Sequence, residues 1–241
     1  PNAIKVFNED VLPKGFRPKG IRIDSGDIAY LSKKARKMLD DAGFEDALIM
    51  ASNSLDEFTI KNILVQGAKI DAFGVGERLI TSKSDPVFGG VYKMTGIEGK
   101  DGKIIPKIKI SENVTKITTP GFKEIHRFYD KSSNKAIADV VSLHDEVLPE
   151  DKLEIFHPIY TWKRKTLNNY YSKKLLVQIY DKGKLVYKMP SLDEIRNKAQ
   201  SEIDSLWDEV SRIDNPTEYI VDLSEELWKT RDALLKKYGK N

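Results

Sequence analysis

Four residues that carry a charge or a hydroxyl stand within six positions near the start of the chain. Arg22, Asp24, Ser25 and Asp27 lie in the stretch G-I-R-I-D-S-G-D. An unpaired buried charge is costly, so this stretch requires either solvent or a polar ligand. Asp24 can accept hydrogen bonds from two neighbouring sugar hydroxyls; capping of the following helix is the alternative, which Ser25 or Asp27 would serve equally well. Arg22 shares a strand face with Asp24 and can pair with it.

Two later stretches have the composition of loops that bind phosphate or sugar. Gly74 and Gly76 form a G-V-G sequence, and glycine lets backbone N–H groups approach phosphate oxygens closely in a concave nest. A tight turn that merely requires glycine is the alternative. The position after an apolar run, beside other polar loops, favours the phosphate interpretation. Asn53 is equally ambiguous, because it suits a left-handed turn as well as a phosphate or ribose contact.

The apolar pattern places each polar stretch at the end of a strand. The predicted strand ends at Asp24, Ala51 and Phe73 lie roughly 25 residues apart, a normal length for a strand–helix unit. Helical spacing of apolar residues predicts the intervening helices. Parallel α/β folds bind ligands at the carboxyl ends of their strands. The three loops should therefore converge on one face and suit a sugar phosphate.

The rest of the chain changes to antiparallel hairpins and then to helices. Period-two alternation around polar turns predicts three hairpins. These pair residues 91–97 with 104–110, 122–129 with 136–143, and 175–180 with 185–188. Capping boxes at Ser54–Glu57 and Ser191–Glu194 predict helix starts, and Leu223–Tyr238 is expected to form a last helix. We expect an α/β region at 1–90, a β-rich region at 91–189 and C-terminal helices at 190–241.

Composition excludes several classes of protein. The chain has 241 residues, 32% of them charged, with a net charge of +3. This is a mixed surface rather than the one-sided field of a nucleic-acid-binding protein. The sequence contains no cysteine, which excludes disulfides and thiolate metal sites and fits a cytoplasmic location. His126, His144 and His157 are scattered without a ligand spacing, so we expect no metal site among them.

An ordered series of motifs resembles the nicotinate phosphoribosyltransferase family. The motifs are R-I-D-S-G-D at 22–27, A-S-N and L-D-E within 51–57, F-G-V-G at 73–76, G-G-V-Y-K at 89–93, W-K-R-K at 162–165, and N-P and V-D-L within 215–223. Each motif is weak alone, but the ordered set covers nearly the whole chain. It matches the C-terminal half of such an enzyme. The implied fold is the C-terminal part of an α/β (TIM-like) phosphoribosyltransferase barrel, followed by antiparallel β hairpins and C-terminal helices.

The resemblance also implies an activity and roles for residues. The complete enzyme would make nicotinate mononucleotide and pyrophosphate from nicotinate and phosphoribosyl pyrophosphate in NAD salvage, with ATP and Mg²⁺, as a homodimer. Arg22 would meet the nicotinate carboxylate, Ser25 would assist Arg22 or Asp24, and the Gly74–Gly76 loop would hold the 5′-phosphate. Glu77 stands where the family commonly has threonine, so only its backbone N–H is expected to help. The family's phosphorylated histidine belongs to the N-terminal half.

Three parallel strands cannot close a barrel, which commonly has eight. We therefore expect a fragment or one of two polypeptides, with the N-terminal half of the enzyme as its partner. A sister enzyme that takes nicotinamide is one alternative. A non-catalytic module that binds a sugar phosphate is another. The basic run at 162–174 is interpreted as a solvated face, and a loop that meets ATP or pyrophosphate remains open.

Overall fold

The computed structural model describes residues 1–160 and 162–239, which form two compact units. The first unit spans Pro1–Gly90 and the second spans Val91–Asn241. Residues 240 and 241, at the end of the expected C-terminal helical region, lie outside the described residues. No helix in the described part of the chain is long and apolar enough to cross a membrane.

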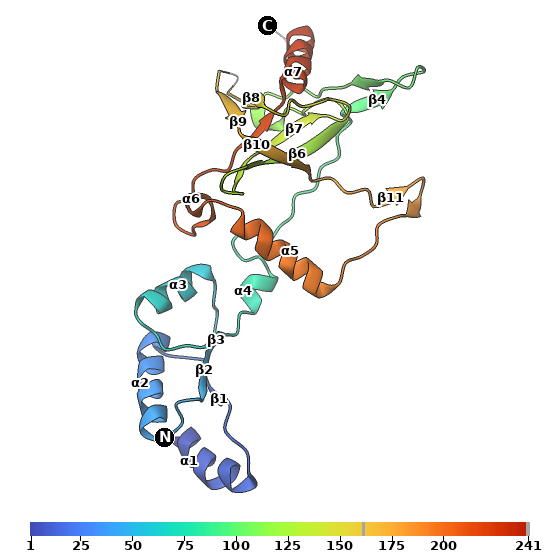
Figure 1. Cartoon of the computed structure of the whole chain (residues 1–241). Helices are drawn as coiled ribbons and strands as arrows, with labels where there is room; N and C mark the ends of the chain where they lie inside the picture. The colour runs from blue at the N-terminus through green and yellow to red at the C-terminus, as the bar shows by residue number, and fades with distance from the viewer. Residues whose placement is uncertain (161, 240–241) are drawn as a thin grey trace. The chain divides into compact units, whose positions relative to one another are not determined.

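A three-stranded parallel sheet organises the first unit (Figure 1). Its order is β1 (Gly20–Ile23), β2 (Leu48–Ala51) and β3 (Ala72–Phe73). Helices α2 (Ile28–Asp41) and α3 (Glu57–Val65) form the crossovers between the strands. The three predicted strand–helix units are confirmed, and the carboxyl ends of the strands share one edge.

Buried apolar side chains hold this sheet against its helices. Ile49 and Ala51 of β2 are fully buried, and Leu39 of α2 is 2% exposed. A preceding helix, α1 (Asn2–Val6), continues through a π-helical turn whose Phe7 ring packs edge-on against Phe44, with centroids 5.2 Å apart.

Aspartates cap both crossover helices. The Asp27 carboxylate accepts a hydrogen bond from the Tyr30 N–H at 2.9 Å, and the Asp56 carboxylate accepts one from the Thr59 N–H at 2.8 Å. The predicted capping box that begins at Ser54 is therefore wrong. Ser54 has a left-handed φ of 49°, whereas Asp56 has the extended backbone that an N-cap residue needs.

Gly20 allows the first two strands to approach each other. A Cβ at Gly20 would lie 2.2 Å from the Leu48 carbonyl oxygen, a backbone atom that cannot rotate away. We expect Gly20→Ala to destabilise the first unit by roughly 1–3 kcal/mol, as overpacking typically does. Urea denaturation followed by circular dichroism measures this. Gly89→Ala is the control, since a Cβ at Gly89 would meet no atom within 4 Å; equal stability of the two variants would contradict the prediction.

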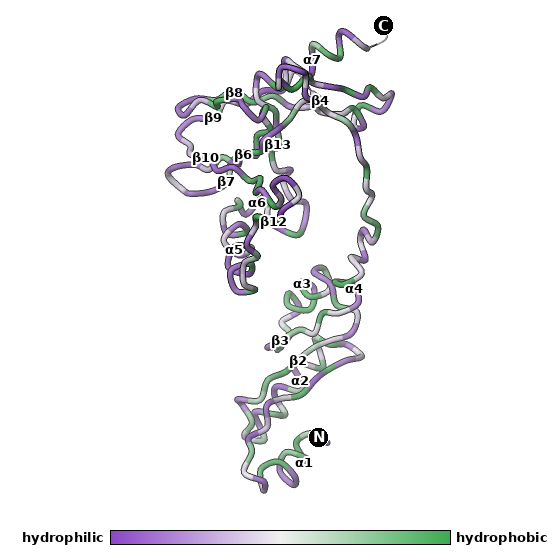
Figure 2. Tube along the Cα trace, turned by 90° about the vertical axis from the view of Figure 1, so that its right-hand side faces the viewer, coloured by the Kyte–Doolittle hydropathy of each residue, from purple (hydrophilic) through white to green (hydrophobic). Residues whose placement is uncertain are grey.

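A six-stranded mixed sheet forms the core of the second unit. Its order is β10 (Tyr170–Lys174), β6 (Lys123–Asp130), β7 (Ala136–Leu143), β13 (Val221–Leu223), β8 (Lys152–Phe156) and β9 (Arg164–Asn168). The β6–β7 hairpin was predicted and is confirmed. Phe128, Val140 and Ile155 are fully buried between these strands. Figure 2 shows apolar residues, in green, along this sheet.

The other two predicted hairpins are much shorter than expected. One pairs β4 (Gly96–Glu98) with β5 (Ile104–Pro106), and the other pairs only β11 (Tyr180–Asp181) with β12 (Lys184–Leu185). Both stand outside the six-stranded sheet. Their alternating residues stay exposed, as at Ile105 and Leu185, so no buried face extends the pairing.

The described part of the second unit also contains a 3-10 helix at Val114–Lys116 and three α-helices. Helix α5 (Leu192–Asp204) begins with the predicted Ser191–Glu194 capping box, which is confirmed. None of its residues is buried, so its apolar side chains remain at least partly exposed. Two helices follow, α6 (Asp208–Ser211) and α7 (Glu225–Tyr238). Helix α7 starts later than predicted because Leu223 belongs to β13 and Ser224 is the cap.

Candidate functional site

Three polar side chains meet at the carboxyl edge of the parallel sheet. Arg22 Nε donates a hydrogen bond to Ser52 Oγ at 2.8 Å, and Ser52 Oγ donates to Asp24 Oδ1 at 2.5 Å. Arg22 Nη2 lies 2.7 Å from the same Asp24 oxygen. The convergence of the first two loops, predicted from their place after parallel strands, is confirmed by these contacts.

This triad is held in place but remains accessible. The side chains of Arg22 and Asp24 are 59% and 55% exposed, whereas Ser52 is 9% exposed. The hydrogen bond from Ser52 and then the Arg22 guanidinium lower the pKa of the Asp24 carboxyl, so it is ionised at neutral pH. Exposed ion pairs contribute little to stability, so both charges are available to a ligand.

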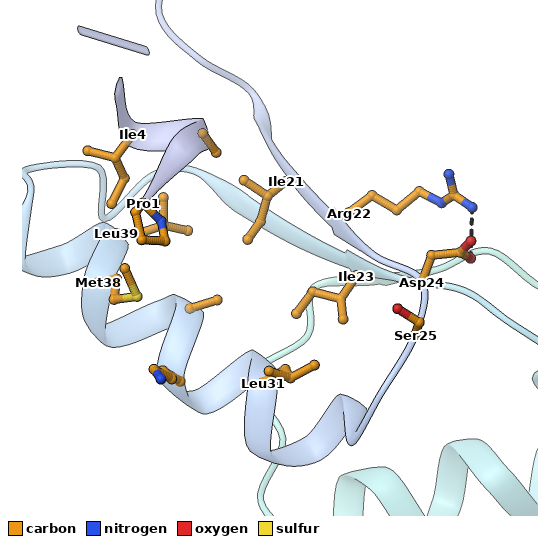
Figure 3. A pocket seen from close by; sticks show the side chains of 13 residues that line it. Pro1, Ile4, Ile21, Arg22, Ile23, Asp24, Ser25, Leu31, Met38 and Leu39 are labelled. Carbon is orange, nitrogen blue, oxygen red and sulfur yellow. Dashed lines mark ion pairs between the residues drawn. The ribbon is translucent and has the colours of Figure 1, made fainter. Parts of the chain in front are cut away.

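The sequence left Arg22 with two roles, a pair with Asp24 or a contact to a ligand carboxylate. The structure contains the pair (Figure 3), with the Nε and Nη2 sides of the guanidinium directed at Ser52 and Asp24. Nη1 is the part of the fork that neither contact uses. The assignment of Arg22 to a ligand stays a prediction.

An apolar cavity lies beside the triad. Its volume is about 480 Å³ and it is lined by α1, β1 and α2. Figure 3 shows Ile21 and Ile23 directed toward Leu31 and Leu39, while Arg22 lies alongside Asp24. Ser25 also lines this cavity, next to Asp24, and remains a predicted ligand contact.

Asn53 adopts the left-handed turn conformation, which was the alternative to a ligand contact at this position. Its φ of 94° lies in the left-handed region, and Ser54 follows at 49°. Asparagine tolerates this conformation better than most residues. The turn accounts for the residue type at this position, and the ribose or phosphate contact stays a prediction.

The two glycines of the third loop differ in their surroundings. The Gly74 N–H donates to the Ala51 carbonyl at 2.8 Å, so this group is already used within the fold. A Cβ at Gly74 would lie 3.4 Å from Ser52 Cβ, which brings this loop against the triad. A Cβ at Gly76 would meet no atom within 4 Å, and Gly76 directly precedes helix α4 (Glu77–Ile80). Phosphate binding by Gly74, Gly76 and the Glu77 N–H stays a prediction.

An ion pair between Asp56 and Arg78 joins the second loop to the third. Hydrogen bonds from Thr59, and then Arg78, lower the pKa of Asp56 to about 2. Sequence reasoning missed both this pair and Ser52. The signal for Ser52 was its position directly after the apolar run of β2, where Asn53 was chosen instead.

The histidines and acids form no metal site in the described part of the chain. No group of three or more His, Cys, Asp or Glu side chains is close enough there to hold an ion.

Within the basic run at 162–174, Lys163 lies over the Tyr160 ring at 4.7 Å and Lys173 over the Tyr129 ring at 5.1 Å. Tyr170, which also lies within this run, is a core residue that is 3% exposed.

Comparisons with known proteins give a consistent result. The sequence pattern of the nicotinate phosphoribosyltransferase C-terminal domain matches residues 122–231. The chain is 47% identical to nicotinate phosphoribosyltransferase of Bacillus subtilis over 96% of its own length and 47% of that protein. It is 37% identical to the Caenorhabditis elegans protein of the same name, over 89% of its length and 39% of the relative's.

A solved structure resembles the chain as well. The crystal structure of human nicotinic acid phosphoribosyltransferase superposes with a TM-score of 0.69 at 26% identity, covering 91% of this chain and 41% of that one. The chain thus spans less than half the length of these relatives.

Proposed function

Because this chain is a homologue of the C-terminal part of nicotinate phosphoribosyltransferases, we propose that it supplies part of such an enzyme's active site. The proposed reaction joins nicotinate to the ribose C1 of phosphoribosyl pyrophosphate and releases pyrophosphate, in NAD salvage. The observation that carries this proposal is the similarity over 96% of the chain to the Bacillus subtilis enzyme. The Arg22–Ser52–Asp24 triad supports it, because it lies at the strand edge where α/β folds bind ligands.

Each side chain of the triad has a task in this reaction. The C1–pyrophosphate bond breaks with positive charge developing at C1, so an ionised carboxylate nearby stabilises the transition state. Asp24 supplies that charge and can accept hydrogen bonds from the ribose hydroxyls. Arg22 presents a planar guanidinium that suits the nicotinate carboxylate. Ser52, which is hydrogen-bonded to both, fixes their positions.

The nicotinate phosphoribosyltransferase family implies ATP and Mg²⁺ for the complete enzyme. ATP would stimulate the reaction, and Mg²⁺ would neutralise the pyrophosphate. The residues that the structure describes bring together no cluster of acids or histidines to hold a metal, so no step is assigned to a protein-held ion. The complete enzyme, with an N-terminal half and as a cytoplasmic homodimer, is part of the same proposal.

A chimera tests the proposal directly. The matching segment of the Bacillus subtilis relative is replaced by this chain, and pyrophosphate release is measured with nicotinate or nicotinamide in the presence of phosphoribosyl pyrophosphate. We expect nicotinate-dependent release that is lost in the Arg22→Ala chimera. The Arg17→Ala chimera is the matched control, since Arg17 also forms an exposed pair, with Asp46, in the first unit.

The other outcomes separate the alternatives. Activity with nicotinamide alone would indicate the sister enzyme. A folded chimera that binds ribose 5-phosphate but releases no pyrophosphate would indicate a non-catalytic module. Either result would contradict the proposed function.

A further inference from the structure

The sheet of the second unit divides at one point and leaves a cavity. Strands β13 and β8 are antiparallel neighbours, yet they pair only at Leu223 and Phe156. Beyond that pair the two strands separate, with Asp222 next to Leu223 on one side and His157 next to Phe156 on the other. A cavity of about 400 Å³ lies between them, and β9 contributes Arg164 and Lys165 to its wall.

Asp222 is a buried acid without a partner in this cavity. It is 7% exposed, and none of the residues that the structure describes donates a hydrogen bond to it. Burial raises the pKa of its carboxyl, while the positive charge of Lys165 opposes that rise. A buried carboxylate with no donor is costly, so the fold alone gives no reason for an acid here.

The opposite wall of the cavity carries positive charge and one ring N–H donor, that of His157. Lys163 and Lys165 supply the charge, whereas the Arg164 guanidinium lies over the Phe156 ring at 5.1 Å and 3.8 Å from Glu154, on the other face of β9. The Nδ1 atom of His157 accepts hydrogen bonds from the backbone N–H groups of the next turn, at 3.1 Å and 2.9 Å. The neutral ring therefore carries its proton on Nε2, which neither of these bonds uses.

The cavity has cations on one side and a carboxylate on the other, so a matching ligand needs both anionic groups and hydrogen-bond donors. Phosphate oxygens suit the cationic wall, and sugar hydroxyls are the donors that an unpartnered carboxylate lacks. Glu218 lies on the same side as Asp222 and would repel phosphate, which places the phosphates toward β9. We propose that this cavity binds a ribonucleotide, with its hydroxyls on Asp222 and its phosphates on Lys163 and Lys165.

This site lies in the second unit, so the inference goes beyond the proposed function of the first. The test is isothermal titration calorimetry of the full chain at fixed ionic strength, with ATP and inorganic tripolyphosphate as probes. We expect Lys165→Ala to weaken both by about tenfold, the effect of one charge-assisted hydrogen bond. Asp222→Asn should weaken the binding of ATP by about tenfold, because it removes the carboxylate that the ribose hydroxyls contact. Tripolyphosphate has no hydroxyls, so its affinity should stay the same or increase.

Control variants locate the binding. Lys184→Ala changes an exposed lysine of β12 outside the cavity and should alter neither affinity. Arg22→Ala should also leave both affinities unchanged, because Arg22 belongs to the candidate site of the first unit. The proposal is overturned if wild type binds neither probe, if Arg22→Ala abolishes ATP binding, or if Asp222→Asn leaves the ratio of the two affinities unchanged.

Stability measurements show whether Asp222→Asn folds. Folding raises the pKa of Asp222, so the folded chain holds this proton more tightly than the unfolded chain. The stability that Asp222 contributes is thus lost as the pH rises from the unfolded value of about 3.9 through the folded value. At pH 7 the melting temperature of Asp222→Asn should therefore be higher than that of wild type. At pH 3 the two melting temperatures should be equal. The other titratable groups that line the cavity are common to both proteins: His157, Lys163, Arg164, Lys165, Glu218 and Tyr219.

Discussion

Replacing Arg127 with methionine is expected to lower the free energy of unfolding of the second unit by about 3–5 kcal/mol, the usual cost of removing one partner of a buried ion pair. Arg127 Nε and Nη2 donate to the two Asp139 carboxylate oxygens at 2.8 and 2.9 Å, and Nη1 donates to Glu202 at 2.6 Å. Asp139 is 8% exposed. Methionine retains much of the apolar stem but leaves this carboxylate buried without its cation.

The network around Arg127 connects elements that are far apart in sequence. Tyr219 donates its hydroxyl hydrogen bond to Asp139 at 3.0 Å, and Glu202 belongs to α5. Burial, followed by the Asp139 charge, raises the pKa of Tyr219 well above its ordinary value, so the hydroxyl stays a donor. Because α5 has no buried residue, we infer that the bond from Arg127 to Glu202 is a main attachment of this helix to the sheet.

Tryptophan fluorescence during urea denaturation measures this effect. All three tryptophans, Trp162, Trp207 and Trp228, lie in the second unit, so the signal reports its unfolding alone. Arg127→Lys, which keeps the charge but loses the bidentate geometry, should fall between wild type and Arg127→Met. The double variant Arg127→Met with Asp139→Leu should recover much of the loss. A loss below about 1 kcal/mol in Arg127→Met would place this pair among weak surface ion pairs.

Local signals in the sequence predicted the first unit well. Apolar runs and polar strand ends recur at a regular interval there, and every crossover is formed by the nearest helix, so neighbours in sequence are neighbours in the sheet. Ser54 shows the limit of such signals. Its place in an S-x-x-E pattern suggested a cap, but the left-handed turn after β2 moves the helix start to Asp56.

The second unit depends on contacts that no short window of sequence contains. Strand β13 is three residues long and pairs in parallel with β7, whose partner residues lie about 80 positions earlier. Its last residue, Leu223, leads directly into a helical pattern and was assigned to that helix. Placing β13 between β7 and β8 is also what separates Asp222 from His157 and opens the cavity there.

The candidate site was predicted by residue type better than by geometry. Arg22 and Asp24 share a strand face, as their spacing requires, and lie together. What their spacing could not show is the buried hydroxyl between them, because Ser52 comes from the neighbouring strand through the β1–β2 register. Likewise, the Gly74 N–H was assigned to phosphate, but the Ala51 carbonyl accepts it across β2 and β3.

Arg22→Lys is expected to lower kcat/KM for nicotinate roughly ten- to a hundredfold in the chimeric enzyme. Lysine keeps the charge but cannot bond Ser52, Asp24 and a ligand carboxylate from one planar group, and a charge-assisted hydrogen bond contributes about 1.5–3 kcal/mol. Asp24→Asn keeps the shape of the side chain and removes the charge near C1. It should lower kcat more than it weakens nicotinate binding, because the charge interacts with a positive centre that develops only in the transition state.

The exposure of the pair makes the structural explanation testable. Since both side chains are more than half exposed, removing their ion pair should change the free energy of unfolding by less than about 1 kcal/mol. Arg17→Lys provides the matched control, because Arg17 and Asp46 form a similarly exposed pair, 47% and 55%, in the same unit. Steady-state kinetics and thermal unfolding of the three variants decide between the roles. If Arg22→Lys and Arg17→Lys lower the melting temperature alike and leave kcat/KM unchanged, Arg22 is a structural residue and the ligand site lies elsewhere.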